Sequence, residues 1–235
     1  MKQILAMVVA LGSCSCLFAR QQDHEADRLQ RAAQVIKMVM TMPGPAIPAQ
    51  LIDHALCIGI IPSAVSIELG LGAHFGRGVL VCRVNHEKTW SAPWMFTVGG
   101  ASYGLIPEGD SANVIFLVMT RKGERKFMKS GLKVGVDASA SSGPVAEKAG
   151  ITAIPVPRSD LVAYSMRRGR FSGASLEGVI LKPDDDADLH LYGHRVGAAE
   201  VLTHSSVTPP AAAKPLEEML ARFCSFRSDA ALAKF

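Results

Sequence analysis

From about residue 57 to residue 191, short apolar, β-prone runs alternate with turns rich in glycine, proline and aspartate. This alternation is typical of strands joined by tight turns. No run is followed by a long helical pattern, which is the rhythm of a doubly wound parallel sheet. We therefore expect an α+β fold: a single compact domain with an antiparallel β core, sandwich- or barrel-like, flanked by helices. The clearest predicted strands are Gly78–Val84, Trp94–Val98, Asn113–Met119, Leu132–Val136 and Ala174–Leu181.

Helical patterns lie on both sides of the β-prone region. Residues 25–40 carry apolar side chains at three- and four-residue spacing, which predicts an amphipathic helix. Its stripe is expected to pack on the core, with insertion into a membrane as the alternative. A short helix is expected after Pro48, then a strand from Cys57 that ends at Pro62. Further helices are expected within 193–202 and at 216–223, the last in a peripheral tail.

The first residues have the order of a secretory signal: Lys2, an apolar run from Ile4 to Leu11, then small residues. We expect residues 1–19 to be a signal peptide or lipoprotein leader. Two cleavage sites stay open, a lipobox that would acylate Cys14 and an ordinary cut after Ala19. Either would make the chain an exported protein, periplasmic or anchored to an outer membrane as a lipoprotein.

The remaining cysteines, Cys57, Cys82 and Cys224, form an odd and widely spaced set that does not suggest a disulfide framework. We expect two buried thiols and one thiol in the tail, since Cys57 and Cys82 lie in apolar runs. The net charge of +4 is too small to indicate nucleic-acid binding.

Several glycine-rich and aromatic motifs follow one another in a fixed order. They are Ile60-Ile61-Pro62, Gly70-Leu71-Gly72, Gly76-Arg77-Gly78-Val79-Leu80, Trp90-Ser91-Ala92-Pro93, Gly135-Val136-Asp137-Ala138-Ser139, Ser142-Gly143-Pro144-Val145, Ala163-Tyr164-Ser165 and the run from Arg170 to Gly178. In these motifs the chain resembles the SYLF family. The resemblance implies one mixed α/β domain over 24–203, followed by a tail over 204–235. It also implies lipid binding, with actin binding in some eukaryotic members. The segment Leu105–Gly109 departs from the family pattern.

Two patterns suggest catalysis or a metal site. Gly100–Gly104 matches the G-x-S-x-G elbow around Ser102, with Asp137 or Asp160 and His190 or His194 downstream. Glycines and Pro107 deny Ser102 the helix that this elbow needs, so a serine hydrolase is the least favoured function.

The sequence Asp184-Asp185-Asp186 predicts an acidic hairpin tip, because the glycine and glutamate of an EF-hand loop are missing. His190 and His194 have the spacing of helical zinc ligands, but Gly193 lies between them. We predict no catalytic residue, no metal and no cofactor.

Basic residues gather at two places. One group surrounds a predicted glycine turn, and the other precedes Phe171; together they are Arg121, Lys122, Arg125, Lys126, Lys129 and Lys133, and Arg167, Arg168 and Arg170. Basic residues near an anionic membrane contribute about 1 kcal/mol each. With the family resemblance, these groups predict a non-enzymatic module whose partner is an anionic phospholipid membrane surface. The alternative is a protein partner, in a protein-interaction or actin-binding-like scaffold role.

Overall fold

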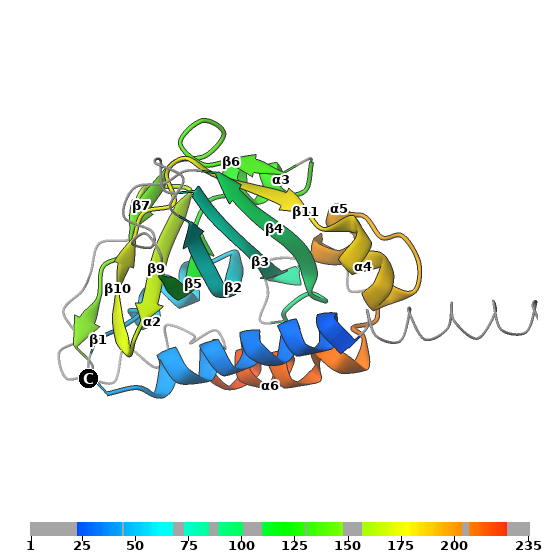
Figure 1. Ribbon diagram of the computed structural model, residues 1–235, viewed down its shortest axis with the longest axis horizontal. Helices are drawn as coiled ribbons and strands as arrows, with labels where there is room; N and C mark the ends of the chain where they lie inside the picture. Colours follow the sequence, from blue (N-terminus) through cyan, green and yellow to red (C-terminus); the bar gives the residue numbers. More distant parts are fainter. Residues whose placement is uncertain are drawn as a thin grey trace, which may run out of the picture.

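The computed structural model describes residues 23–43, 45–67, 73–84, 89–100, 110–129, 131–147, 157–203 and 207–224, and the elements discussed below are drawn in Figure 1. The expected leader with Cys14, and Ser102 of the elbow motif, lie outside these ranges. The acylation of Cys14 therefore stays a prediction.

A curled, mixed sheet forms the centre of the fold (Figure 1). Within the described residues it has nine strands in the order β10-β9-β5-β2-β3-β4-β11-β6, and β7 joins β9 in parallel. A separate antiparallel pair links β1 to β8. The bounds are β1 Pro45–Ala46, β2 Cys57–Ile67, β3 Ala73–Cys82, β4 Trp94–Gly100, β5 Ser111–Val118, β6 Leu132–Lys133, β7 Ala140–Ser142, β8 Ala146–Glu147, β9 Leu161–Arg167, β10 Arg170–Ala174 and β11 Val179–Pro183. The predicted α+β domain with an antiparallel β core is confirmed.

Side chains of the central strands alternate between two hydrophobic clusters, one on each face of the sheet. On β3, Val79 and Val81 enter one cluster while Leu80 and Cys82 enter the other. Both faces of these strands are therefore buried, which explains why their sequences are apolar throughout. A glycine makes room for an aromatic ring at Gly59, where a Cβ would lie 2.0 Å from the ring of Phe116.

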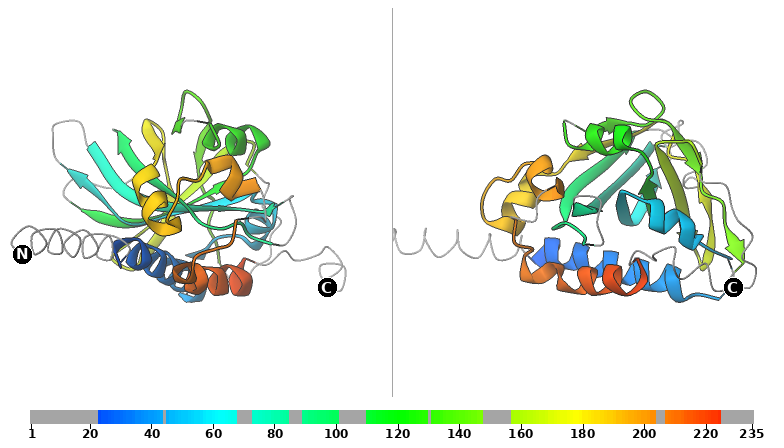
Figure 2. Two further views of the ribbon diagram at one scale, coloured as in Figure 1. Left: turned by 90° about the vertical axis from the view of Figure 1, so that its right-hand side faces the viewer. Right: turned by 180° about the vertical axis from the view of Figure 1, so that it is seen from behind.

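Three helices cover the first face: the N-terminal helix over residues 23–41, α2 (Ala49–His54) and α6 (Lys214–Phe223). Figures 1 and 2 show the N-terminal helix and α6 side by side beneath the sheet. Leu29 and Ile36 of the N-terminal helix are at most 2% exposed. The predicted amphipathic helix is therefore present, and its apolar stripe is part of the core rather than a free membrane anchor.

The C-terminal segment contributes to the same core. Leu216 and Leu220 of α6 are buried, and the buried guanidinium of Arg83 donates to the carbonyl of Cys224 at 3.2 Å. Arg83 also donates to the carbonyl of Ala55 after α2, at 3.2 Å. Our expectation of a peripheral tail is wrong for residues 214–224, because α6 supplies apolar side chains that the sheet needs as a cover.

The opposite face packs against α3 (Arg121–Phe127) and α5 (Ala198–Thr203). Phe127 of α3 stacks on Phe116, with ring centroids 5.8 Å apart. The predicted turn at Lys122-Gly123 is thus a helix, which begins where the Thr120 hydroxyl accepts a hydrogen bond from the Gly123 N–H at 3.1 Å.

Three further local predictions are wrong. The strand from Cys57 continues through Pro62 as β2, because a bulge at Ser63, where φ is 53°, absorbs the irregular register. Ala174–Leu181 divides into β10 and β11 around a turn at Gly178. The acidic hairpin tip is the start of α4 (Asp185–Tyr192), since Asp184 and Asp188 have partners in the core.

The two buried cysteines predicted as free thiols are joined. Cys57 and Cys82 are register partners on β2 and β3, and their sulfurs form a disulfide. Sequence spacing could not reveal this pairing, because it depends on the register of the hairpin. Cys224 keeps a free thiol, and burial raises its pKa to about 12.

Candidate functional site

The first predicted basic group lies on and beside α3. Arg121, Lys122, Arg125 and Lys129 are exposed, and two lysines have acidic partners: Lys122 Nζ lies 3.3 Å from Asp160, and Lys126 Nζ lies 3.2 Å from Asp137. The Lys133 backbone N–H and the Lys126 ammonium lower the pKa of Asp137. This surface therefore keeps an excess of positive charge, although part of it is compensated.

Lys133, in β6, belongs to the same surface, and the exposed Val136 follows it in a turn. The side chain of Val136 is 72% exposed. An apolar side chain thus projects within a basic surface, which we call the α3 surface: Arg121, Lys122, Arg125, Lys126, Lys129, Lys133 and Val136.

The second basic group is at the turn between β9 and β10. Arg167 and Arg168 lie 3.0 and 3.4 Å from the same carboxylate, that of Asp110. The Ser111 N–H and the Arg167 side chain lower the pKa of Asp110. Arg170 is exposed at the start of β10. One acidic residue thus compensates much of the charge of this group.

The structure does not bring the two groups together. Strand β9 pairs with β5, so that Leu161 faces Val118, the residue before the α3 segment, while Met166 faces Asn113. Arg167 is therefore separated from the α3 surface by the length of β9, roughly 20 Å at the rise of a strand. The two predicted groups do not form one binding face.

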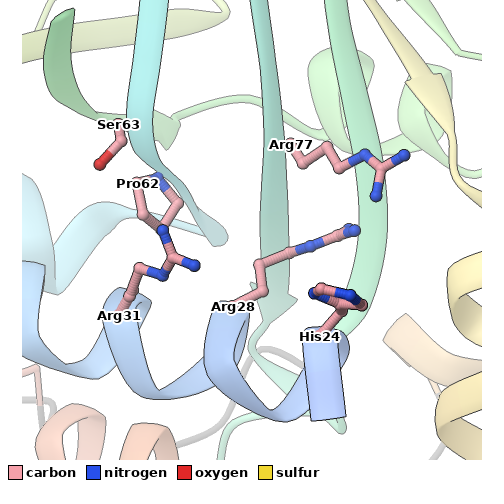
Figure 3. A pocket seen from close by; sticks show the side chains of 6 residues that line it. All are labelled: His24, Arg28, Arg31, Pro62, Ser63 and Arg77. Atoms are coloured by element: carbon pink, nitrogen blue, oxygen red, sulfur yellow. The ribbon is translucent and has the colours of Figure 1, made fainter. Parts of the chain in front are cut away.

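A basic pocket that we did not predict lies between the N-terminal helix and the sheet. It has a volume of about 250 Å³ and is lined by His24, Arg28, Arg31, Pro62, Ser63 and Arg77 (Figure 3). The first three residues recur at four- and three-residue spacing, which places them on one side of the helix. That spacing is the signal by which the sequence could have indicated half of the pocket.

Arg28 forms the fixed wall of this basic pocket. Its side chain is only 7% exposed and lies between Glu25, at 2.8 Å, and Asp184, at 3.0 Å. Burial raises the pKa of Glu25, which the Arg28 guanidinium opposes. The charge of Arg28 is thus compensated by two carboxylates that hold its side chain in place.

Arg77, on β3, is different. Arg31 pairs with Asp27, whereas Arg77 is exposed and has no ion pair among the residues that the structure describes. Figure 3 shows the side chains of Arg77, Arg28 and His24 turned to the same side of the pocket. The pocket therefore presents the uncompensated guanidinium of Arg77 next to a fixed positive wall.

An apolar pair adjoins the basic pocket. Val65 of β2 and Phe75 of β3 are register partners and are 39% and 43% exposed. Phe75 precedes Arg77 by two residues on β3, so both side chains stand on the same face of the sheet. The pocket and the pair together give this end of the sheet an arginine, a histidine and an aromatic side chain within one surface.

The residues named for catalysis or metal binding are placed as follows. Asp137 bonds to Lys126, and Asp160 accepts hydrogen bonds from Thr120 and from the Ser139 N–H. Within the described ranges, these contacts pair both carboxylates with groups other than a histidine. Cys57, Cys82 and Glu124 have ligand atoms within 4.8 Å of one another, but the two sulfurs are bonded to each other.

Comparison with protein-family models gives a match over residues 99–223 to the family Ysc84, described as Las17-binding protein actin regulator. Among similar proteins, "Protein YSC84" of Saccharomyces cerevisiae is 27% identical over 183 residues, covering 77% of this chain and 39% of the relative. "LAS seventeen-binding protein 3" of the same yeast is 28% identical over 177 residues, or 74% and 38%. "SH3 domain-containing YSC84-like protein 1" of Bos taurus is 26% identical over 182 residues, or 77% and 52%. These relatives are longer proteins, of which the chain spans about half or less.

These comparisons confirm the resemblance found in the sequence and overturn the expected location. The relatives are proteins of yeasts and cattle, organisms whose cells have neither a periplasm nor a bacterial outer membrane. No helix in the described part of the chain is long and apolar enough to cross a membrane. The expectation of an exported periplasmic or outer-membrane lipoprotein is therefore wrong.

Proposed function

Because the chain belongs to the Ysc84 family of Las17-binding protein actin regulators, we propose that it is a non-catalytic protein-interaction domain whose partner is the actin filament. A relative named for binding the protein Las17 supports a protein as partner. The observation that carries the proposal is the exposed pair Val65 and Phe75.

The pair is unusual for the strands that carry it. Further along the same strands, Ile60 and Val79 are register partners on the same face and are fully buried beneath the N-terminal helix. Val65 and Phe75 continue that apolar face into solvent. Aromatic side chains are enriched where proteins bind one another, since they supply a large contact area with little loss of side-chain freedom.

Co-sedimentation with purified actin filaments tests this proposal. We expect saturable pelleting of the chain, weakened by Phe75→Ser. Val145→Ser is the matched control, because Val145 is also an exposed valine, at 42%, but lies elsewhere. Pelleting no greater than without filaments refutes the proposal, as does an equal loss in both variants.

A second candidate function is binding to an anionic phospholipid membrane through the α3 surface. The observation in its favour is Val136, 72% exposed among Lys133 and the basic residues of α3. Basic side chains attract anionic headgroups, and an apolar side chain among them adds contact with the acyl region.

Flotation with vesicles tests the second candidate. Vesicles of phosphatidylcholine with phosphatidylserine should carry the chain, and pure phosphatidylcholine vesicles should not. Arg125→Glu with Lys129→Glu should weaken flotation by about 2 kcal/mol or more. Added salt should also weaken it, because the attraction decays over about 8 Å at physiological ionic strength. Flotation insensitive to salt and to both substitutions would exclude the α3 surface.

A further inference from the structure

We propose that the basic pocket and the Val65–Phe75 pair form one docking site for an acidic segment of a partner protein, with an apolar side chain beside its carboxylates. This inference rests on the proposed protein-binding function and names the chemistry of the partner. It is carried by the charge of Arg77, the fixed position of Arg28 and the exposure of the adjoining pair.

The charge of the pocket selects an anionic group. Arg77 has no ion pair within the described residues and stands exposed on β3. A guanidinium presents a planar fork of N–H donors that matches a carboxylate with two parallel hydrogen bonds. His24, on the facing helix, adds a third nitrogen-bearing side chain to the pocket. A carboxylate that enters the pocket therefore meets Arg77 as its direct partner.

The pocket is held in shape before any partner binds. Arg28 is fixed by Glu25 and Asp184, and these contacts join the N-terminal helix to the start of α4. Ser63 is fixed on the opposite side, because its N–H donates to Asn113 Oδ1 at 3.0 Å. A wall that is already ordered loses little conformational freedom on binding, which favours affinity.

The size of the pocket limits what enters it. Its volume of about 250 Å³ is below the usual range for a drug-sized ligand, so a single acidic side chain fits better than an extended small molecule. The rest of the contact then lies outside the pocket. Phe75 is two residues from Arg77 on β3, which places an apolar contact one side chain away from the anion.

The acidic residues around the pocket argue for a protein segment rather than a membrane. Asp27, Glu25 and Asp184 border the pocket, and a continuous anionic surface would meet all three carboxylates. A peptide places its few carboxylates only where the arginines are. The membrane is therefore the outcome that the experiment must separate from the proposal.

Fluorescence anisotropy with three labelled peptides tests the docking site. The probes are DDLWDD, its uncharged analogue NNLWNN and its polar analogue DDSSDD. We expect DDLWDD to bind about tenfold more tightly than either analogue, since each analogue lacks one half of the contact. Arg77→Gln and Phe75→Ser should each weaken DDLWDD binding by about tenfold. Both residues are exposed, so the melting temperature should not change.

Arg125→Gln is the matched control, because Arg125 is an exposed arginine on the α3 surface. It should leave DDLWDD binding unchanged. Equal affinity for DDLWDD and NNLWNN overturns the proposal, and so does a loss in Arg125→Gln with none in Arg77→Gln. Flotation on phosphatidylserine vesicles that is lost in Arg77→Gln also overturns it, in favour of a membrane.

The failure of this inference is distinguishable from the failure of the proposed function. Actin co-sedimentation that survives in Arg77→Gln leaves the proposed function standing and removes the docking site. Specific DDLWDD binding without co-sedimentation keeps the docking site and removes actin as the partner.

Discussion

Replacing Leu29 by alanine tests whether the N-terminal helix is a structural part of the core. The Leu29 side chain is fully buried between the helix and the sheet. The substitution removes three carbon atoms, worth about 0.8 kcal/mol each for transfer from water. The cavity left behind adds a further penalty, because the surroundings relax only in part. We expect the free energy of unfolding to fall by about 3 kcal/mol.

Urea denaturation followed by tryptophan fluorescence measures this loss, since Trp94 is buried within the core. Met38→Ala is the matched control on the same helix. Its side chain is 45% exposed, so the change should stay below about 0.5 kcal/mol. A loss below 1 kcal/mol for Leu29→Ala, together with loss of vesicle binding, would refute the reasoning. The helix would then act as a membrane anchor instead of a cover for the sheet.

Three further predictions concern the core and the absence of catalysis. The double variant Cys57→Ala, Cys82→Ala should unfold at lower urea, because a disulfide across 25 residues contributes about 3 kcal/mol; an unchanged midpoint would contradict the cross-link. Burial raises the pKa of Asp188 to about 8. The folded chain therefore holds a proton that the unfolded chain loses near pH 4, and stability should fall by up to about 1.4 kcal/mol per pH unit between pH 5 and pH 8. Asp188→Asn should flatten that slope, and an identical slope in the variant would contradict the assignment. A fluorophosphonate probe should leave Ser102 unlabelled; stoichiometric labelling would contradict a non-catalytic domain.

The strands were the part of the fold most accessible from sequence. Predicted runs such as Trp94–Val98 and Asn113–Met119 became β4 and β5, because they are bordered by glycine, proline and aspartate. Where the runs were divided wrongly, tertiary contacts decide the structure. Pro62 lies inside β2 because the bulge at Ser63 accommodates it, and no local signal distinguishes that from a strand end.

Helix α3 was read as a turn because Gly123 follows Lys122. The glycine has a packing reason instead: a Cβ at Gly123 would lie 3.2 Å from Val118 and 3.3 Å from the Asp160 carbonyl oxygen. Such close approach cannot be read from the sequence. The basic group was located correctly, but its placement on a helix and its separation from Arg167 by the length of β9 depended on the sheet register.

The basic pocket escaped prediction for a similar reason. Arg28, Ser63 and Arg77 come from three separate elements and meet only after the N-terminal helix packs across the sheet. The sequence marks each as an ordinary polar residue. The motif Gly76-Arg77-Gly78 was noted for its glycines, whereas the arginine between them points into the pocket.

The most direct measurement is competition between the acidic peptide and actin filaments for the chain. The chain is pelleted with filaments while DDLWDD or NNLWNN is added at increasing concentration. If the domain binds its protein partner through Arg77 and the Val65–Phe75 pair, DDLWDD should release the chain into the supernatant and NNLWNN should not. Pelleting that persists at saturating DDLWDD, or that both peptides abolish equally, would contradict the account.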